Sequence, residues 1–315
     1  MVELLAELNH RVIVLDALTY AGNIQNIRHL RKNFDVDFIE GRIEDKNLVS
    51  QILEKFKIDV LINFAAETHV DNSISSPRQF IVSNVLGTFE LVLASQEYLE
   101  RCSLRDFKFV QISTDEVFGE VGSDGKGFSE STSYAPRSPY SASKASADHI
   151  VRAWCNTYGF PGLITHCSNN FGPRQNKEKL IPKIITNAIR GKKIPIYGDG
   201  KNIRDWLYVT DHCKGIYQAI EKGRAGESYC FGGGNEYQNI QIAQKVCAQL
   251  DEIRPLKNDK FYASQIEYVE DRKGHDRHYA VDFTKACREL GYKPEHSIDP
   301  MIRNTIEFYL SLKKS

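Results

Sequence analysis

Residues 107–119 spell FKFVQISTDEVFG, an apolar run that ends abruptly in hydroxyl and carboxyl side chains. Such a run is typical of a strand that is buried on both faces of a parallel sheet. Comparable runs occur at 11–16, 36–40, 59–66 and 162–168, and helical periodicity fills the segments between them. The alternation predicts an α/β fold, a Rossmann-like doubly wound parallel sheet.

After residue 172 the pattern is less regular. Short strands are expected at 194–197 and 228–231, and a last helix near 298–312. No Gly/Ser/Pro-rich spacer separates the two halves. We therefore expect a cofactor-binding domain over 1–172 and a smaller α/β substrate domain over 173–315, partly interleaved with the first.

Composition excludes several classes of protein. The 315 residues include 41 basic and 41 acidic side chains, so bulk charge does not indicate nucleic-acid binding. No apolar stretch is long enough to span a bilayer, and residues 1–10 lack the basic segment of a secretory signal. The seven cysteines form no CxxC pair, and no ligand set for a metal is evident. A cytoplasmic protein without a metal is predicted.

The amino-terminal segment is unusual for a dinucleotide-binding fold. Residues 2–8 have a helical pattern and are followed by the first strand, which ends in Asp16. The acid that binds the ribose lies about twenty residues after the glycine turn in such folds. If Asp16 is that acid, the first strand and its glycine-rich loop would precede Met1. Alternatively, Asp16 is a solvated acid at a strand end.

Two motifs carry acid–base chemistry. Tyr140 and Lys144 lie four residues apart, on one face of a predicted helix, where the ammonium would lower the pKa of the phenol. The alternative is a chance spacing. Asp115 and Glu116 follow the strand at 107–113, and their repulsion would leave one of them protonated, which gives one acid and one base. The alternative is that Thr114 or Asp115 caps a helix.

Polar residues also follow the other strands. Cations at 177–179, 204 and 272–273 suit a diphosphate, although each segment is equally a solvated basic face. Asn169 and Asn170 end the strand at 162–168 and could bind ligand groups or shape a turn.

Taken together, seven segments occur in an order that resembles the dTDP-glucose 4,6-dehydratase family of the extended short-chain dehydrogenase/reductase superfamily. They are STDEVFG, SPYSASKASADH, CSNNFGP, EKLIP, IPIYGDG, NIRDWLYV and DRKGHDRHYA. The resemblance runs from about Val12 to the carboxyl terminus. The adjacent Asp-Glu pair distinguishes this family from related sugar-nucleotide epimerases.

The resemblance implies a lyase of deoxysugar biosynthesis that uses NAD. Tyr140, with Lys144 and Thr114, would remove the proton of the sugar C4 hydroxyl. Glu116 would remove the C5 proton, and Asp115 would protonate the departing C6 hydroxyl. A UDP-sugar dehydratase or epimerase, or a non-catalytic remnant, remains the alternative.

The resemblance also implies binding residues and an assembly. NAD would contact Asp16, Leu18, Thr19, Ile43, Ala65, Ala66, Ser83, Tyr140, Lys144 and Asn170. The nucleotide sugar would contact Thr68, Thr114, Asn169, Lys179, Leu180, Pro195, Tyr197, Arg204, Asn235, Asp271 and His275. Helices near 79–99 and 140–158 would form the four-helix bundle of a homodimer. Arg42 departs from the family, which has an aspartate against the adenine there.

Overall fold

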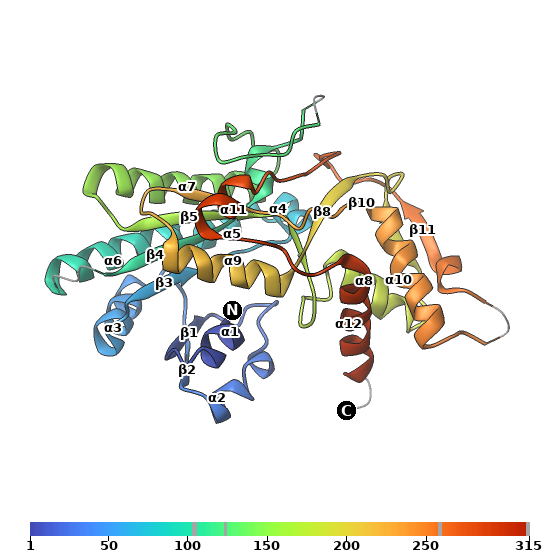
Figure 1. The fold of residues 1–315 in the computed structure, drawn as a ribbon, viewed down its shortest axis with the longest axis horizontal. Helices are drawn as coiled ribbons and strands as arrows, with labels where there is room; N and C mark the ends of the chain where they lie inside the picture. The colour runs from blue at the N-terminus through green and yellow to red at the C-terminus, as the bar shows by residue number, and fades with distance from the viewer. Residues whose placement is uncertain (103–105, 123–124, 258–259, 313–315) are drawn as a thin grey trace.

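The structure is a computed structural model that describes residues 1–102, 106–122, 125–257 and 260–312. Figure 1 shows strands and helices in an elongated arrangement, with α6 and α7 near one end and α10 and β11 near the other. Among the described residues, the structure has no helix with the length and apolar character needed to cross a bilayer.

The central sheet has four parallel strands in the order β3-β4-β5-β9. Their bounds are β3 Val60–Asn63, β4 Lys108–Thr114, β5 Gly162–Cys167 and β9 Ser228–Phe231. Six of the seven residues of β4 are buried, as expected for a strand covered on both faces. This confirms the strand predicted at 107–113.

A separate parallel pair is formed by β1 Val12–Asp16 and β2 Val36–Glu40. The pair lies with α1 Val2–Glu7, a 3-10 turn Ile24–Asn26 and α2 Leu30–Asn33 in a small amino-terminal unit, drawn in dark blue in Figure 1. No strand among the described residues bonds to both β1 and β3, so the first half holds two parallel sheets.

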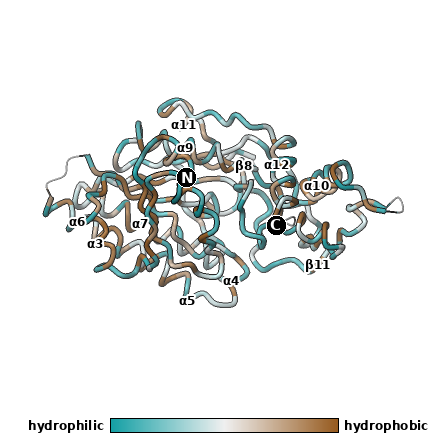
Figure 2. The backbone as a smooth tube through the Cα atoms, turned by 90° about the horizontal axis from the view of Figure 1, so that it is seen from below, coloured by the Kyte–Doolittle hydropathy of each residue, from teal (hydrophilic) through white to brown (hydrophobic). Residues whose placement is uncertain are grey.

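Helices cover both faces of the central sheet. One face is covered by α3 Lys46–Phe56, α6 Gly87–Cys102 and α7 Pro139–Tyr158. The other is covered by α9 Val209–Lys222 and α11 Thr284–Leu290. Hydrophobic residues are prominent along α3 and α7 in Figure 2, and their burial against the strands provides the main driving force for this packing.

The helix predicted near 79–99 is interrupted. It consists of α5 Pro77–Phe80, a π-helical segment Ile81–Leu86 and then α6, and it is preceded by α4 Val70–Ser75. Within the π-helical segment, the buried Asn84 side chain bonds to the backbone of Glu67 and to the Ser143 hydroxyl. Such π-helical turns are frequent at functional sites.

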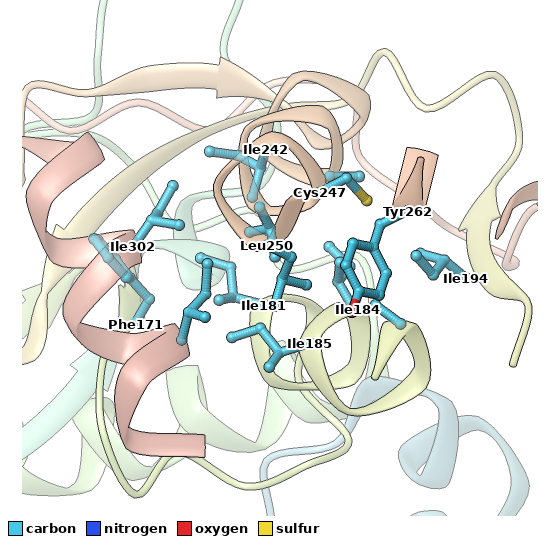
Figure 3. Close-up of a cluster of buried hydrophobic side chains, with 14 of the residues drawn as sticks. Phe171, Ile181, Ile184, Ile185, Ile194, Ile242, Cys247, Leu250, Tyr262 and Ile302 are labelled. Atoms are coloured by element: carbon cyan, nitrogen blue, oxygen red, sulfur yellow. The ribbon is translucent and has the colours of Figure 1, made fainter. Parts of the chain in front are cut away.

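The second half forms its own core but also contributes to the first sheet. Its strands are β6 Asn169–Phe171, β7 Ile194–Tyr197, β8 Ile203–Tyr208, β10 Glu236–Gln238 and β11 Ile266–Val269. Its helices are α8 Leu180–Ala188, α10 Asn239–Ile253, a 3-10 turn Tyr262–Gln265 and α12 Ile298–Ser311. Figure 3 shows the core between α8, α10 and α12, with Ile181, Leu250 and Ile302 at its centre. Because β9 and α9 belong to the first sheet, the two halves interleave.

Candidate active site

The carboxyl end of β4 carries the predicted acid pair. Thr114 caps a short 3-10 helix, Asp115–Phe118, by accepting a hydrogen bond from the Glu116 backbone N–H at 3.3 Å. Helix capping is the alternative role that the sequence allows for Thr114, and this cap is present. Thr114 also interacts with the acid pair and the tyrosine. Its hydroxyl donates to the Asp115 carboxyl at 3.2 Å, and it lowers the pKa of the Tyr140 phenol. The cap thus fixes the acid pair beside the tyrosine.

Asp115 lies in an environment that keeps it protonated. Its side chain is 2% exposed and its Oδ2 atom has no hydrogen-bond partner. Burial first, and the charge of Glu116 second, raise the pKa of Asp115 to about 8, against the opposing effect of Arg204. At neutral pH the group is an acid, as the repulsion argument predicts.

Glu116 is balanced differently. Burial raises the pKa of its carboxyl, but Lys179, Arg204 and Arg272 all lower it. Burial outweighs the three cations, so the pKa of Glu116 is raised overall. For Asp115, the Arg204 charge and the Thr114 hydroxyl oppose the rise in pKa. The arrangement sets a protonated Asp115 next to a second carboxyl that can act as a base once it is ionised.

Tyr140 and Lys144 are placed by the start of α7. Ser138 forms a capping box with Ser141, and Pro139 occupies the first turn, so the helix begins directly before Tyr140. Both side chains are buried, and Lys144 Nζ donates to the Ile112 carbonyl at 2.6 Å. Tyr140 and Lys144 thus lie beside the β4 end, as predicted.

The expected pKa of the phenol is contradicted. Burial raises the pKa of Tyr140 well above its usual value, and the charge of Glu116 adds to this effect. The sequence argument counted the ammonium one turn away but omitted burial, which outweighs it. The ammonium of Lys144 is bonded to a backbone carbonyl of β4.

Three cations from the second half of the chain act electrostatically on Glu116 of the acid pair. Arg204 on β8 is 7% exposed, stacks on the Tyr279 ring at 4.2 Å and donates to the backbone carbonyls of Asp276 and Ile203. Lys179 donates to the Thr68 carbonyl at 3.0 Å. Sequence reasoning named the segment of Arg272 as basic but did not select this residue, whose position follows only from the fold.

A second group lies around Tyr197 on β7. The Tyr197 hydroxyl donates to Asp71 at 3.2 Å, and Arg272 pairs with Asp71 at 3.3 Å while stacking on the Tyr197 ring. His275 bonds to Asp271 at 2.6 Å and meets the edge of the Tyr197 ring. Asp71 joins this group although the sequence gave no motif for it. These contacts bring three predicted substrate residues of the second half, Tyr197, Asp271 and His275, together with Asp71 of the first half.

The remaining predicted substrate residues have more varied positions. Asn169 Oδ1 is buried without a partner, so it is free to accept a hydrogen bond from a ligand. The Asn235 amide instead bonds to the Gly233 carbonyl and shapes its own turn. Leu180 begins α8 directly after Lys179, and Pro195 lies on β7 opposite Glu267 of β11.

The predicted cofactor residues follow the ends of several strands. Asp16 ends β1 and accepts a hydrogen bond from the Leu18 N–H at 2.7 Å. A cleft of about 420 Å³ is lined by Thr19, Tyr20, Arg42, Glu44, Glu67, Arg78, Gln79, Val82 and Ser83. Its size is within the range of small-molecule sites, and two predicted residues, Thr19 and Ser83, line it.

The other predicted cofactor residues do not line this cleft. Ala65 and Ala66 directly follow β3, and the Ala65 N–H donates to Asn63. Ile43 is buried in the core beneath α6, against Gly87. The Asn170 amide oxygen accepts a hydrogen bond from His212 Nδ1 at 3.0 Å, and its amide nitrogen donates to the Ser168 carbonyl. Asn84, which links Glu67 to Ser143, was missed because its role depends on the π-helical segment.

Comparisons with known proteins agree with this geometry. Residues 1–305 match the model of the family described as GDP-mannose 4,6 dehydratase. A dTDP-glucose 4,6-dehydratase of Xanthomonas campestris pv. campestris is 50% identical over 304 residues, which cover 96% of this chain and 86% of that protein.

Two crystal structures are similar throughout. That of dTDP-glucose 4,6-dehydratase from Bacillus anthracis in complex with NAD has a TM-score of 0.86 at 39% identity and covers 99% of this chain and 91% of its own. That of the Streptomyces venezuelae enzyme, with NAD and a second ligand bound, has a TM-score of 0.88 at 39% identity, covering 97% and 89%. The chain therefore belongs to the family described as GDP-mannose 4,6 dehydratase, and within it is similar to the dTDP-glucose 4,6-dehydratases.

Proposed function

We propose that this chain is an NAD-dependent enzyme that dehydrates dTDP-glucose to dTDP-4-keto-6-deoxyglucose. The observation that carries the proposal is the buried Asp115, whose pKa of about 8 leaves it protonated directly beside Glu116. An elimination of water needs both groups at once: a base that removes a proton and an acid that protonates the leaving hydroxyl. An epimerization at C4 through a 4-keto intermediate loses no hydroxyl, so it needs no acid for a leaving group.

NAD fits the residues that surround the cleft. Arg42 and Arg78 provide positive charge for a phosphate-bearing ligand, and Thr19 and Ser83 provide hydroxyl groups. Asp16, at the end of β1, is the carboxylate that would bind a ribose diol. Bound NAD would supply the redox chemistry of the reaction, as the hydride acceptor for C4 and the hydride donor for C6 of the sugar.

The chain's own residues would handle the protons. Tyr140 would take the proton of the C4 hydroxyl. Burial raises the pKa of its phenol, and the positive charge of Lys144 one helical turn away would oppose that rise. The 4-keto group acidifies C5, so Glu116 can take the C5 proton. Asp115 would then protonate the C6 hydroxyl, which leaves as water.

The cations would hold the diphosphate of the substrate. Arg204, Lys179 and Arg272 all act electrostatically on Glu116, which places their charges around one site. Arg204 is held by two backbone carbonyls and by the Tyr279 ring, so it needs little reorganisation on binding. Asn169, His275 and Tyr197 would complete the contacts with the sugar nucleotide.

The assembly and location are part of the same proposal. We infer a homodimer in which α6 and α7 of two subunits form a four-helix bundle. In support, the outer face of α7 exposes the small residues Ala142, Ser146 and Ala153, which permit close helix packing. All seven cysteines are free, as is usual for a cytoplasmic protein. Light scattering after gel filtration would test the dimer.

Substrate preference is tested with mass spectrometry. The chain is incubated with excess NAD⁺ and either dTDP-glucose or UDP-glucose, and loss of one water is measured. We expect loss of water from dTDP-glucose in preference to UDP-glucose, and none with Glu116→Gln. A sugar that changes configuration without losing water would instead indicate an epimerase.

A further inference from the structure

Strand β4 lies against three successive turns of helix α7. The Ile112 carbonyl accepts from Lys144, and the Ser113 hydroxyl donates to Asp148 at 2.6 Å. The next strand residue, Thr114, lowers the pKa of Tyr140. Residues 140, 144 and 148 are four apart, so they share the face of the helix that lies on the strand. Tyr140, Lys144 and Thr114 have roles in the proposed reaction, whereas Asp148 has none so far.

Asp148 is the end point of a chain of hydrogen-bond donors. Its Oδ2 atom accepts from Ser113 and, at 3.1 Å, from the Tyr134 hydroxyl. The Tyr134 oxygen in turn accepts from Arg152, and it lies 2.7 Å from His166 Nε2. His166 Nε2 also lies 3.4 Å from the same Asp148 oxygen. Hydrogen-bond donors that converge on one carboxyl oxygen favour its charged form.

The carboxylate is fully buried and incompletely paired. Asp148 is 0% exposed, and its Oδ1 atom has no hydrogen-bond partner. A buried charge is costly unless an opposite charge compensates it. The buried cation one helical turn away is Lys144, which is 4% exposed. Burial lowers the pKa of Lys144, and Asp148 is the main group that opposes this effect, followed by Cys167 on β5.

We propose that Asp148 is a positioning residue that keeps Lys144 charged and aligned beneath Tyr140, with Ser113, Tyr134 and His166 fixing its carboxylate. The inference rests on the proposed function only for the role of Lys144 beside Tyr140. The effect of the Asp148 charge on Lys144 does not depend on which reaction the chain catalyses. Lys144 serves the phenol only as an ammonium, so a neutral residue at 148 would limit the reaction at alkaline pH.

The test measures the ionisation of Lys144 directly. The full chain is labelled with [6-¹³C]lysine, and the Lys144 signal is assigned by its loss in Lys144→Arg. In Asp148→Asn the amide oxygen can still accept from Ser113 and Tyr134, so the substitution mainly removes charge. We expect the titration midpoint of Lys144 to fall by about 1–3 pH units, the effect of losing a nearby opposite charge.

Two further variants separate charge from folding. Asp211→Asn is the matched control, because Asp211 is also buried but bonds to the backbone of Glu295 and to His296. The Lys144 midpoint should not move in this control. If Asp148→Asn does not fold, Asp148→Ser, which is also neutral and smaller, should show the same fall. Asp148→Glu should largely restore the midpoint.

The pH dependence of water loss gives a second readout. In Asp148→Asn the alkaline limit of kcat should move to lower pH, while KM for dTDP-glucose changes little. An unchanged Lys144 midpoint in Asp148→Asn, or an equal fall in Asp211→Asn, would overturn the proposal. If the wild-type chain does not dehydrate dTDP-glucose, the proposed function fails, but the Lys144 midpoint still decides the electrostatic role of Asp148.

Discussion

Replacing Asp115 by asparagine should stabilise the fold at neutral and alkaline pH. The same substitution should strongly slow dehydration. The pKa of this carboxyl rises from 3.8 to about 8 in the folded chain, mainly through burial. The folded state therefore holds a proton that the unfolded state releases over this range. Higher pH favours the state with fewer bound protons, so the wild type loses stability as the pH rises from about 4 to 8.

The size of the effect follows from the same shift. A difference of one bound proton changes the free energy of unfolding by about 1.4 kcal/mol per pH unit. Between pH 5 and 7 the wild type should lose on the order of 2–3 kcal/mol relative to Asp115→Asn, whose amide carries no proton to release. Asp115 thus lowers the free energy of unfolding at neutral pH. Its role as the acid of the reaction explains why a carboxyl occupies this buried position.

Urea unfolding of both proteins at pH 5, 6, 7 and 8 measures this difference. Asp299→Asn, which removes an exposed carboxylate paired with Lys245, is the control and should show no comparable trend. In the same variant, Asp115→Asn, dehydration should fall about 10²- to 10⁴-fold through loss of the general acid. A stability difference that does not depend on pH would refute the assignment of Asp115 as a buried, protonated acid.

Three further substitutions have distinct expected outcomes. Glu116→Gln should lower the rate of C5 proton exchange with solvent by about 10²- to 10⁴-fold, seen by NMR of the sugar in D₂O; exchange at the wild-type rate would contradict its role as base. Tyr140→Phe should block the first step, so that no absorbance at 340 nm develops in a single turnover, whereas a normal transient would exclude Tyr140. Arg204→Lys should raise KM for dTDP-glucose about tenfold or more, because lysine lacks the planar donors that match both the backbone carbonyls and a diphosphate. Steady-state kinetics measure this KM, and an unchanged value would show that Arg204 does not contact the substrate.

Much of the fold follows from local pattern. The strands at 36–40 and 194–197 match the prediction at both ends, because runs of β-branched and aromatic residues flanked by polar ones define a strand unambiguously. The α7 start is equally local, since a serine cap and Pro139 determine it. The π-helical segment at 81–86 was not predicted, because helical periodicity does not distinguish a widened turn that depends on the contacts of Asn84.

The site was predictable where adjacent residues carry it, and less so where distant ones meet. Asp115 and Glu116 are neighbours in the chain, so their repulsion could be anticipated. The pKa of Tyr140 could not, because it depends on burial that only the packed structure determines. Asp71 and Arg272 are 201 positions apart and meet at 3.3 Å through the fold alone.

The central claim is best tested by incubating the chain with dTDP-glucose and NAD⁺ in D₂O and analysing the product by mass spectrometry and NMR. Loss of one water with one deuterium at C5 is predicted, because Glu116 exchanges the C5 proton with solvent. The hydrogen delivered to C6 should carry no deuterium, since it originates at C4 of the sugar. A product that retains the C6 hydroxyl, or a dehydrated product without deuterium at C5, would contradict the account.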